Sequence, residues 1–401
     1  MLYCEESRRH EPLTLDGYQR RALQSDQNER VGADGLRVPL LGLFGEMGSL
    51  LTLPKRKQRE TSTYYRAAII EEFGDVLWYL SNLAARHHLP LSALARAVGA
   101  GEDLRVVNAR ALRTLTFRDV QKKPALKSRR SNRASEADYF ALGGAVGRLM
   151  SEFAAGEHWE LDRAEFVRHL ARTFRLLVLA ASNGAVDLSF CAHNNLAKIA
   201  SRWPQKRIYM RPFDSDCELN EQLPRRIEMY FEERTVGGKT YVFQSCHGIN
   251  VGDRLTDNRT EQDDYRFHDV FHLAYVAFLG WSPVLRALFK VKRKSRPSDD
   301  ENQDGARAIL IEEGVATWIF NHGLDHYLFR NVEKLDYSLL KAIRHLVAGY
   351  EVAKCPLWQW QEAILEGFRV FRALKQHRGG WVTADLKART IAFSVLEPRR
   401  R

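Results

Sequence analysis

Apolar residues recur at intervals of three and four positions through most of the N-terminal half of the chain. This spacing places them along one face of an α-helix. It predicts successive helices over residues 14–27, 39–53, 64–87 and 90–101. A polar, basic stretch at residues 121–134 then interrupts the pattern and is predicted to be a linker. The chain is therefore expected to be mainly α-helical.

The helical pattern begins again after this linker. Residues 141–156 (ALGGAVGRLMSEFAAG) echo residues 40–55 (LLGLFGEMGSLLTLPK), and residues 166–203 echo residues 65–101. Self-similarity of this length is the signature of a duplicated structural unit. The sequence therefore predicts two diverged helical blocks in tandem.

The C-terminal half has a different pattern of hydrophobic and polar residues. Apolar and aromatic residues alternate with polar residues through 226–248, around a Gly-Gly pair, and this alternation predicts a β-hairpin. Residues 390–395 (TIAFSV) could form a further strand. Amphipathic helices are predicted over residues 336–353 and 357–375. A helical domain with a small β element is therefore expected here.

Composition narrows the class of protein. Hydrophobic residues make up 45% of the 401 positions, enough for sizeable cores. The sequence has neither the basic-then-apolar start of a secretion signal nor an uninterrupted apolar run of about 20 residues, so no membrane location is expected. The five cysteines are scattered and odd in number, which argues against a disulfide framework and favours a reducing cytoplasm.

The chain is basic, with a formal net charge of +11. A basic surface indicates an anionic partner such as a nucleotide, a nucleic acid or an acidic protein. Part of the excess is concentrated in short runs, KRKQR (55–59), KSRR (127–130) and KVKRKSR (290–296). Such runs can equally be solvated linkers. Few aromatic residues interleave them, which counts against binding of single-stranded nucleic acid.

Acidic residues interrupt an apolar helix in AIIEEFGDVLWYL (68–80). Glu72 and Asp75 are three residues apart and project from one helix face. Glu46, on the preceding predicted helix, can lie opposite them. Converging carboxylates repel one another unless a cation lies among them, and all-oxygen ligation suits Mg²⁺, with Mn²⁺ as an alternative. On its own, such a pair of acids is more commonly a solvated face or a helix cap.

The motifs GEMGSL and EEFGDVLW resemble those of the MazG-like, all-α nucleoside triphosphate pyrophosphohydrolases, over about residues 12–115. The resemblance implies Mg²⁺-dependent cleavage of a (d)NTP to a monophosphate and pyrophosphate. It also implies Glu46, Glu72 and Asp75 as metal ligands, with Glu71 as an extra carboxylate that helps to orient the attacking water. Ser49 stands where the family has its second glutamate, and a hydroxyl is a weaker ligand than a carboxylate.

The family usually follows its ExxD helix with N-x-x-K-x-x-x-R, a pattern that resembles a phosphate and base grip. The second block carries it intact as Asn195, Lys198 and Arg202, whereas the first block does not. Because each block keeps a different half of the site, we predict that the two pair within one chain and share one composite site. Lys55 and Lys57 are further substrate-binding candidates. Such residues are also ordinary on exposed helix faces.

A second candidate site lies in the segment DDYRFHDVFHLAYV. His268 and His272 are four residues apart with Asp269 between them, a spacing known from metal-binding helices. Glu312 and Glu313 lie in RAILIEEGVATWIF (307–320), a third echo of the first acidic helix. The alternative is a pair of half-buried histidines that simply hydrogen-bond to these acids. The region resembles the C-terminal region fused to some bacterial MazG-like proteins.

The predicted fold is mainly α, with tandem MazG-like bundles as an intrachain pseudo-dimer and a C-terminal helical domain bearing a small β-hairpin. The predicted function is Mg²⁺-dependent nucleoside triphosphate pyrophosphohydrolysis, in nucleotide-pool control or anti-phage defence. A catalytically weak nucleotide sensor or a nucleic-acid-binding regulator is the alternative. The expected assembly is either this intrachain pseudo-dimer or a homo-oligomer. The predicted domains are 1–120 (acidic site), 121–134 (linker), 135–204 (degenerate repeat), 205–262 (linker and hairpin) and 263–401 (helical, with the HDxxH and EE motifs).

Overall fold

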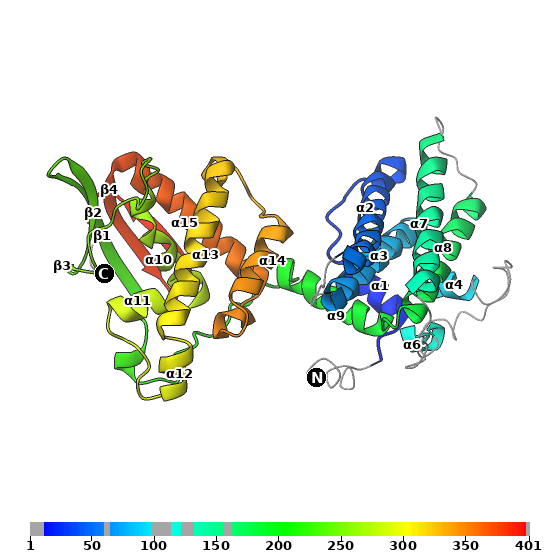
Figure 1. Ribbon diagram of the computed structural model, residues 1–401, viewed down its shortest axis with the longest axis horizontal. Helices are drawn as coiled ribbons and strands as arrows, with labels where there is room; N and C mark the ends of the chain where they lie inside the picture. The colour runs from blue at the N-terminus through cyan, green and yellow to red at the C-terminus, as the bar shows by residue number, and fades with distance from the viewer. Residues whose placement is uncertain (1–11, 60–64, 98–113, 122–131, 156–162, 398–401) are drawn as a thin grey trace. The chain divides into compact units, whose positions relative to one another are not determined.

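A computed structural model describes residues 12–59, 65–97, 114–121, 132–155 and 163–397 (Figure 1). The chain divides into two compact units, Met1–Gln205 and Lys206–Arg401. Each unit has its own cluster of buried apolar residues. Most of the predicted linker 121–134 lies outside the described residues, as does the side chain of Lys57.

The described part of the N-terminal unit is helical, as its hydrophobic pattern predicts. The buried positions follow the helical period: Leu36, Leu40, Leu43, Met47 and Leu50 fall on one face of the second helix. The helices are α1 (Leu15–Leu23), α2 (Gly32–Arg59), α3 (Tyr65–Arg86), α4 (Leu91–Ala97), α6 (Phe117–Val120), α7 (Asn132–Ala155), α8 (Arg163–Asn183) and α9 (Leu188–Arg202).

The same pair of hydrogen bonds, from one glutamine side chain to two backbone groups, occurs twice in the N-terminal unit. The side chain of Gln19 donates to the carbonyl of Leu89 (3.0 Å) and accepts from the amide of Leu91 (2.9 Å), which closes the turn before α4. Gln121 does the same before α9, donating to the carbonyl of Val186 (2.6 Å) and accepting from the amide of Leu188 (2.8 Å). These paired contacts support a duplication independently of the sequence echo.

The two blocks share one core. α3 packs against α9, α4 packs against α8, and α2 packs against α7, so each of these contacts joins one block to the other. Buried residues from both blocks belong to one apolar cluster. Within residues 1–120, Thr14 and Thr116 form an antiparallel bridge where α1 and α6 begin. Helices distant in sequence are thereby brought to the acidic motif on α3.

Two glycines permit close helix contacts around α3. A Cβ at Gly42 would lie 2.2 Å from ring carbons of Tyr79, so α2 can approach α3 only without a side chain there. A Cβ at Gly74 would lie 3.0 Å from the Cβ of Asn195 and 3.1 Å from the carbonyl oxygen of Cys191. Gly74, in the middle of the EEFGD motif, therefore sets how closely α3 approaches α9.

One helix in the N-terminal unit has an exposed apolar stripe. Val38, Leu41 and Phe44 on α2 have relative exposures of 49%, 64% and 52%. The segment Asp34–Lys55 of this helix is long and apolar enough to cross a membrane, as are α8 and α9 if their bent pair counts as one span. The buried helices of soluble proteins meet the same criterion, and the opposite face of α2 packs in the core of its unit.

The C-terminal unit contains a five-stranded antiparallel sheet in the order β3-β2-β1-β4-β5. The predicted hairpin is confirmed as β1 and β2, joined through Gly237 and Gly238, whose φ angles are +61° and +77°. The further strand predicted at residues 390–395 is confirmed as β5, but β4, which pairs with β1, was not predicted, so the sheet is larger than the small element expected. The strands are β1 (Arg226–Val236), β2 (Lys239–Cys246), β3 (Ile249–Asn250), β4 (Gly379–Asp385) and β5 (Thr390–Ser394).

Helices cover this sheet. α10 and α15 pack against each other and against β4 and β5 (Figure 1). α13 carries the third sequence echo, but it packs with α11, α14 and α10 in a unit that contains a sheet. The similarity of residues 307–320 to the first acidic helix is therefore not accompanied by a third helical bundle. The helices are α10 (Asp269–Leu279), α11 (Pro283–Leu288), α12 (Pro297–Asn302), α13 (Ala306–Asp325), α14 (Tyr337–Leu346) and α15 (Leu357–His377).

Candidate functional sites

The acids of the EEFGD motif lie beside the buried stripe of α3. Phe73, Val76 and Leu77 are fully buried, whereas Glu71, Glu72 and Asp75 are half-buried. The helical period explains this arrangement, because the acids flank the apolar face instead of replacing it. They are thus held against the neighbouring helices and retain partial access to water.

Side chains from the second block contact Asp75 directly. The amide nitrogen of Asn195 donates to its carboxylate at 2.8 Å, and the ammonium of Lys198 forms an ion pair with it. Asn195 is itself oriented by the hydroxyl of Tyr18, which donates to its side-chain oxygen at 2.9 Å. Helices α1, α3 and α9 therefore meet at Asp75. The predicted convergence of Asn195 and Lys198 on the acids is what the structure displays.

The remaining acids lie close to this contact. Glu71 is 3.8 Å from the ammonium of Lys198. Burial and the charge of Asp75 raise the pKa of Glu46 on α2, although Lys198 and a hydrogen bond with Glu72 oppose the shift. Burial also raises the pKa of Asp75, against the opposing charge of Lys198. Carboxylates this close, with raised pKa values, are poised to take up a proton or a cation.

The other predicted residues are placed as follows. The guanidinium of Arg202 lies 4.1 Å from the ring centroid of Trp203. Ser49 and Lys55 are exposed on α2. At the second block's counterpart of Glu72, the Nε2 atom of His169 lies 2.8 Å from Glu152. Among the contacts described, Lys198 is the basic candidate that meets the acidic cluster.

The acidic cluster has a less compact arrangement of possible metal ligands than two other groups of side chains. Among the described residues, His268, Asp269 and His272 have ligand atoms within 4.8 Å of one another, and Glu152, Glu165 and His169 form a second, more exposed group. Glu46, Glu72 and Asp75 do not form such a group in the described structure. The Lys198 ammonium instead supplies the positive charge beside Asp75.

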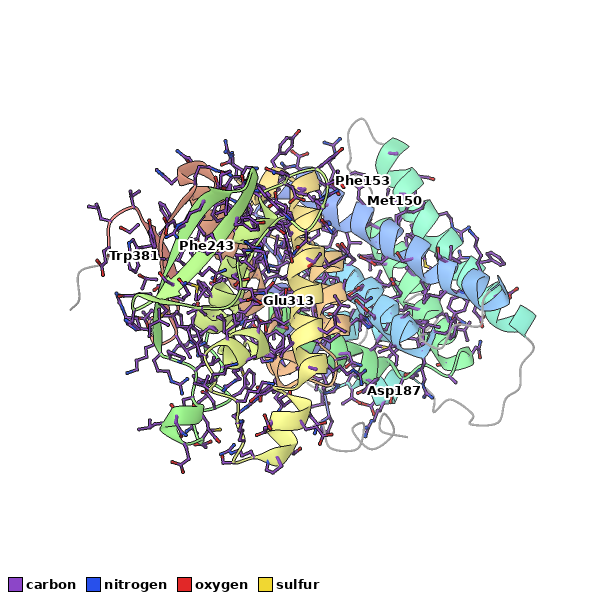
Figure 2. All side chains as sticks on the ribbon, turned by 60° about the vertical axis from the view of Figure 1, so that its left-hand side comes forward. Met150, Phe153, Asp187, Phe243, Glu313 and Trp381 are labelled. Atoms are coloured by element: carbon purple, nitrogen blue, oxygen red, sulfur yellow. The ribbon has the colours of Figure 1, made fainter. Side chains whose placement is uncertain are left out.

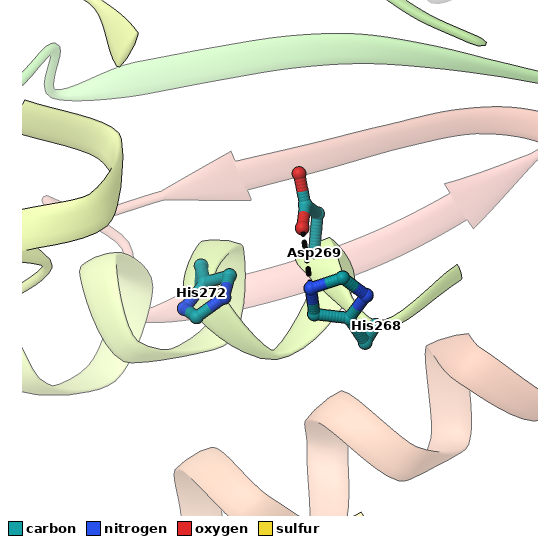
Figure 3. Close-up of side chains that lie close together, drawn as sticks. All are labelled: His268, Asp269 and His272. Atoms are coloured by element: carbon teal, nitrogen blue, oxygen red, sulfur yellow. Dashed lines mark ion pairs between the residues drawn. The ribbon is translucent and has the colours of Figure 1, made fainter. Parts of the chain in front are cut away.

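The second site lies at the start of α10, a helix whose residues are all buried. His268 caps the helix, Asp269 begins it, and His272 follows one turn later (Figure 3). The Nε2 atom of His268 lies 3.1 Å from a carboxylate oxygen of Asp269. Burial of imidazole and carboxylate groups without hydrogen-bond partners would destabilise this helix. The contacts around these side chains therefore decide what the cluster can do.

In both imidazoles the Nδ1 atom already has a hydrogen-bond partner, on the side of the ring opposite Nε2. Nδ1 of His268 lies 2.9 Å from the carbonyl oxygen of Tyr265, and Nδ1 of His272 lies 2.8 Å from Glu312. Each contact requires the Nδ1 atom to carry the proton. In a neutral imidazole this leaves the lone pair on Nε2. Both Nε2 atoms are then available as ligands on the side that faces Asp269 and Glu313.

The two glutamates on α13 have different roles. Glu312 is fully buried and also accepts from the amide of Val284 at 2.8 Å, so both its oxygens are occupied. Glu313, also on α13 (Figure 2), lies 3.7 Å from Nε2 of His268 and 3.5 Å from Nε2 of His272. The sequence could not distinguish which of the two faces the imidazole Nε2 atoms.

The charges of the histidines and glutamates at this site shift one another's pKa values. Burial alone lowers the pKa of His272, but Glu312 and Glu313 outweigh this effect and raise its pKa well above the ordinary value. Burial raises the pKa of Glu313, yet the two histidines outweigh it and hold that pKa well below its usual range. The site therefore stabilises a positive charge between the imidazoles and the carboxylates, either a second proton on His272 or a cation in its place.

Sequence reasoning missed three partners. Gln244, on β2, donates to Asp269 at 2.7 Å, and the ring of Tyr265 stacks on His268 with centroids 4.2 Å apart. Tyr18 orients Asn195 in the other unit. Gln244 and Tyr18 come from segments distant from the motifs they support, whereas Tyr265 lies in the same segment as His268 and is not itself a usual metal ligand.

Comparison with known protein families identifies the C-terminal unit. Residues 208–397 match the MazG C-terminal domain. No MazG pyrophosphohydrolase catalytic domain is identified in the chain, so the predicted relation to MazG proteins is confirmed through the C-terminal domain alone. Searches of curated proteins and of solved structures found no match. The imidazole and carboxylate cluster thus lies within the residues that match the MazG C-terminal domain, and the acidic cluster lies outside them.

Proposed function

We propose that the N-terminal unit is a divalent-cation-dependent nucleoside triphosphate pyrophosphohydrolase. The observation that carries the proposal is the contact of Asn195 and Lys198, from the second block, with Asp75 in the first. Each block alone lacks half of what a triphosphate site needs, namely carboxylates for a cation and a positive charge for phosphate. Their convergence supports one composite site in an intrachain pseudo-dimer.

Glu46, Glu72 and Asp75 would hold Mg²⁺ or Mn²⁺ at this site. The raised pKa of Glu46, caused by burial and by the charge of Asp75, supports this fit, because a cation among the carboxylates would relieve their repulsion. Bound there, the ion supplies charge stabilisation and lowers the pKa of a water molecule. Lys198 would leave Asp75 to neutralise the triphosphate. Glu71, on the same helix, would orient the attacking water.

The proposed location is the cytoplasm. The cysteines in the described part of the chain, Cys191, Cys217, Cys246 and Cys355, are free thiols, which supports a reducing compartment. The proposed partner is a nucleoside triphosphate. The proposed physiological roles are nucleotide-pool control and anti-phage nucleotide depletion, and a substrate profile would help to separate them.

The decisive experiment is a screen of (d)NTPs with Mg²⁺ or Mn²⁺, scored by pyrophosphate release. Asp75→Asn and Glu72→Gln should each lower turnover by more than about 100-fold, because each removes a ligand charge with little change in shape. Asp34→Asn is the matched control, since Asp34 is an exposed residue of α2 paired with Arg37. Wild-type pyrophosphate release from both site variants would contradict the proposal.

A catalytically weak nucleotide sensor is the second candidate. The ion pair of Lys198 with Asp75 favours it, because a lysine already fills the place beside a carboxylate that a cation would need. Ser49→Glu separates the two functions. In an enzyme limited by a missing carboxylate, this change should raise turnover or tighten the Mg²⁺ dependence. In a sensor, nucleotide binding should persist and pyrophosphate release should stay absent in both forms.

Anion binding by the C-terminal unit would suit a regulatory role. A pocket of about 1000 Å³ there is lined by Arg330, Arg369, Arg372, Lys375 and Arg378, with the exposed Tyr327 among its other lining residues. Cations beside an exposed aromatic ring can hold a nucleotide or a nucleic-acid strand. Salt-sensitive binding of a fluorescent oligonucleotide, weakened by Arg330→Ala together with Arg372→Ala, would favour this alternative.

A further inference from the structure

We infer that the C-terminal unit binds one first-row transition metal ion through Nε2 of His268, Nε2 of His272 and carboxylate oxygens of Asp269 and Glu313. Ligand atoms that share one such ion at about 2.0 to 2.2 Å lie about 3 to 4 Å from one another. Nε2 of His268 lies 3.1 Å from Asp269 and 3.7 Å from Glu313, and Nε2 of His272 lies 3.5 Å from Glu313. The ligand atoms of His268, Asp269 and His272 lie within 4.8 Å of one another, which fits one ion among them, and Glu313 approaches both imidazoles from a second side.

A second, independent observation is the state of His272. Its side chain has 0% exposure, and in the described structure its Nε2 atom is buried without a hydrogen-bond partner. A buried polar atom left in this condition destabilises the fold. The atom faces the carboxylate of Glu313 rather than apolar side chains. A metal ion between them would satisfy both groups.

The surrounding contacts are those that support metal-bound histidines. Metal-binding imidazoles donate their other N–H to a carbonyl or a carboxylate, which fixes the tautomer and the ring orientation. His268 makes this contact with the carbonyl of Tyr265, and His272 makes it with Glu312. Gln244 holds the second oxygen of Asp269 at 2.7 Å. Three of the four ligands therefore have a fixed partner behind them.

The donor set selects the class of metal. Two imidazoles and two carboxylates suit zinc, iron(II) or manganese(II), whereas Mg²⁺ and Ca²⁺ prefer oxygen ligands alone. The side chain of Glu313 is 37% exposed, while those of His268, Asp269 and His272 are buried. Water can therefore reach the ion from the Glu313 side. An ion reachable by solvent can exchange a ligand, as catalytic metal ions do and closed structural ones do not.

Elemental analysis of the full-length protein tests the inference. Protein purified without chelators should contain about one equivalent of zinc, iron or manganese per chain, and cobalt(II) loading should produce visible d–d absorption. His268→Ala with His272→Ala should abolish both signals. Glu313→Gln changes a partly exposed ligand and should weaken cobalt affinity by at least about 10-fold without unfolding the protein.

A second histidine pair in the same unit provides the control. His322, in the last turn of α13, and His326, directly after this helix, are also four residues apart, and their ring centroids are 4.5 Å apart. No third donor joins them among the described residues. His322→Ala with His326→Ala should therefore leave the metal content unchanged. Metal-free wild-type protein that also fails to bind added cobalt, or equal metal content in the His268/His272 and control variants, would overturn the inference.

Discussion

The side-chain amide of Asn195 donates a 2.8 Å hydrogen bond to the carboxylate of Asp75, which lies 120 positions earlier in the chain. The two residues occupy α9 and α3, and these helices belong to different blocks of the duplicated unit. An acid of the first block therefore has its environment completed by the second. The functional consequence is that neither block contains the candidate site by itself.

Gly74 keeps these two helices in contact, and Gly74→Ala should disturb both stability and the site. The added Cβ would lie 3.0 Å from the Cβ of Asn195 and 3.1 Å from a backbone carbonyl that cannot move aside cheaply. Overpacking of this kind costs about 1 to 3 kcal/mol. The expected loss appears as a lower urea midpoint for unfolding, together with weaker nucleotide binding.

The matched control for this change is Gly144→Ala on α7. Gly144 is exposed, and a Cβ there meets no atom within 4 Å. Replacing an unconstrained helical glycine should stabilise the protein by about 0.5 to 1 kcal/mol. Equal effects of the two substitutions would show that the contact between α3 and α9 is not tightly packed.

Lys198→Ala should have opposite effects on the binding of nucleotide and of metal alone. Loss of a charge-assisted phosphate contact worth about 1.5 to 3 kcal/mol should weaken binding of a non-hydrolysable nucleotide about 10- to 150-fold. Without nucleotide, Asp75 loses a competing cation, so Mg²⁺ or Mn²⁺ should bind more tightly. Calorimetry can measure both affinities.

The control for Lys198→Ala is Lys206→Ala, which removes an exposed lysine with the same change in net charge. It should alter neither affinity by more than about twofold, because isolated surface charges interact weakly in salt. If Lys198→Ala behaves like this control, Lys198 is only a structural partner of Asp75. The composite triphosphate site would then be wrong.

The sequence predicted part of this site for a specific reason. Helical spacing places Asn195 and Lys198 one turn apart, and the repeat indicated which block would face the acids. It could not predict Tyr18, which reaches Asn195 from α1, because no periodicity links them. It also missed β4, a short strand that opens on Gly379 and Gly380 directly after α15 and becomes recognisable through its pairing with β1. Glu312 and Glu313 are adjacent, so only packing decides which faces the imidazole Nε2 atoms.

Acid stability should depend on Asp264 in the C-terminal unit. Burial raises the pKa of this carboxyl, but hydrogen bonds from Arg378 and Lys375 outweigh it, and the net pKa is lowered. Because the folded pKa lies below the unfolded value of 3.8, the stabilisation is present above about pH 4 and is lost as the pH falls through the folded pKa. The contribution should not exceed about 1 kcal/mol, since solvent screens the cluster.

Asp264→Asn is a suitable variant because the residue has a φ of +70°, a conformation that asparagine also tolerates. The variant should be less stable than wild type at pH 7, and the difference should shrink as the pH falls below about 4. Urea unfolding followed by the fluorescence of the buried Trp281 and Trp360 can measure it. A difference that stays constant from pH 7 to pH 3 would exclude the ionised carboxyl as its source.

Truncation tests whether the two blocks form one folding unit. Residues 1–205 make up one compact unit, and buried side chains from both blocks share its apolar cluster. A fragment ending at residue 205 should therefore be soluble, unfold cooperatively and retain whatever pyrophosphate release the full chain has. A fragment ending at residue 120 should aggregate or self-associate, because it exposes the faces of α3 and α4 that α9 and α8 cover. Co-expression with residues 121–205 should restore solubility and activity together. A monomeric, active fragment of residues 1–120 would place the whole site in the first block and leave Asn195 and Lys198 without a role in it.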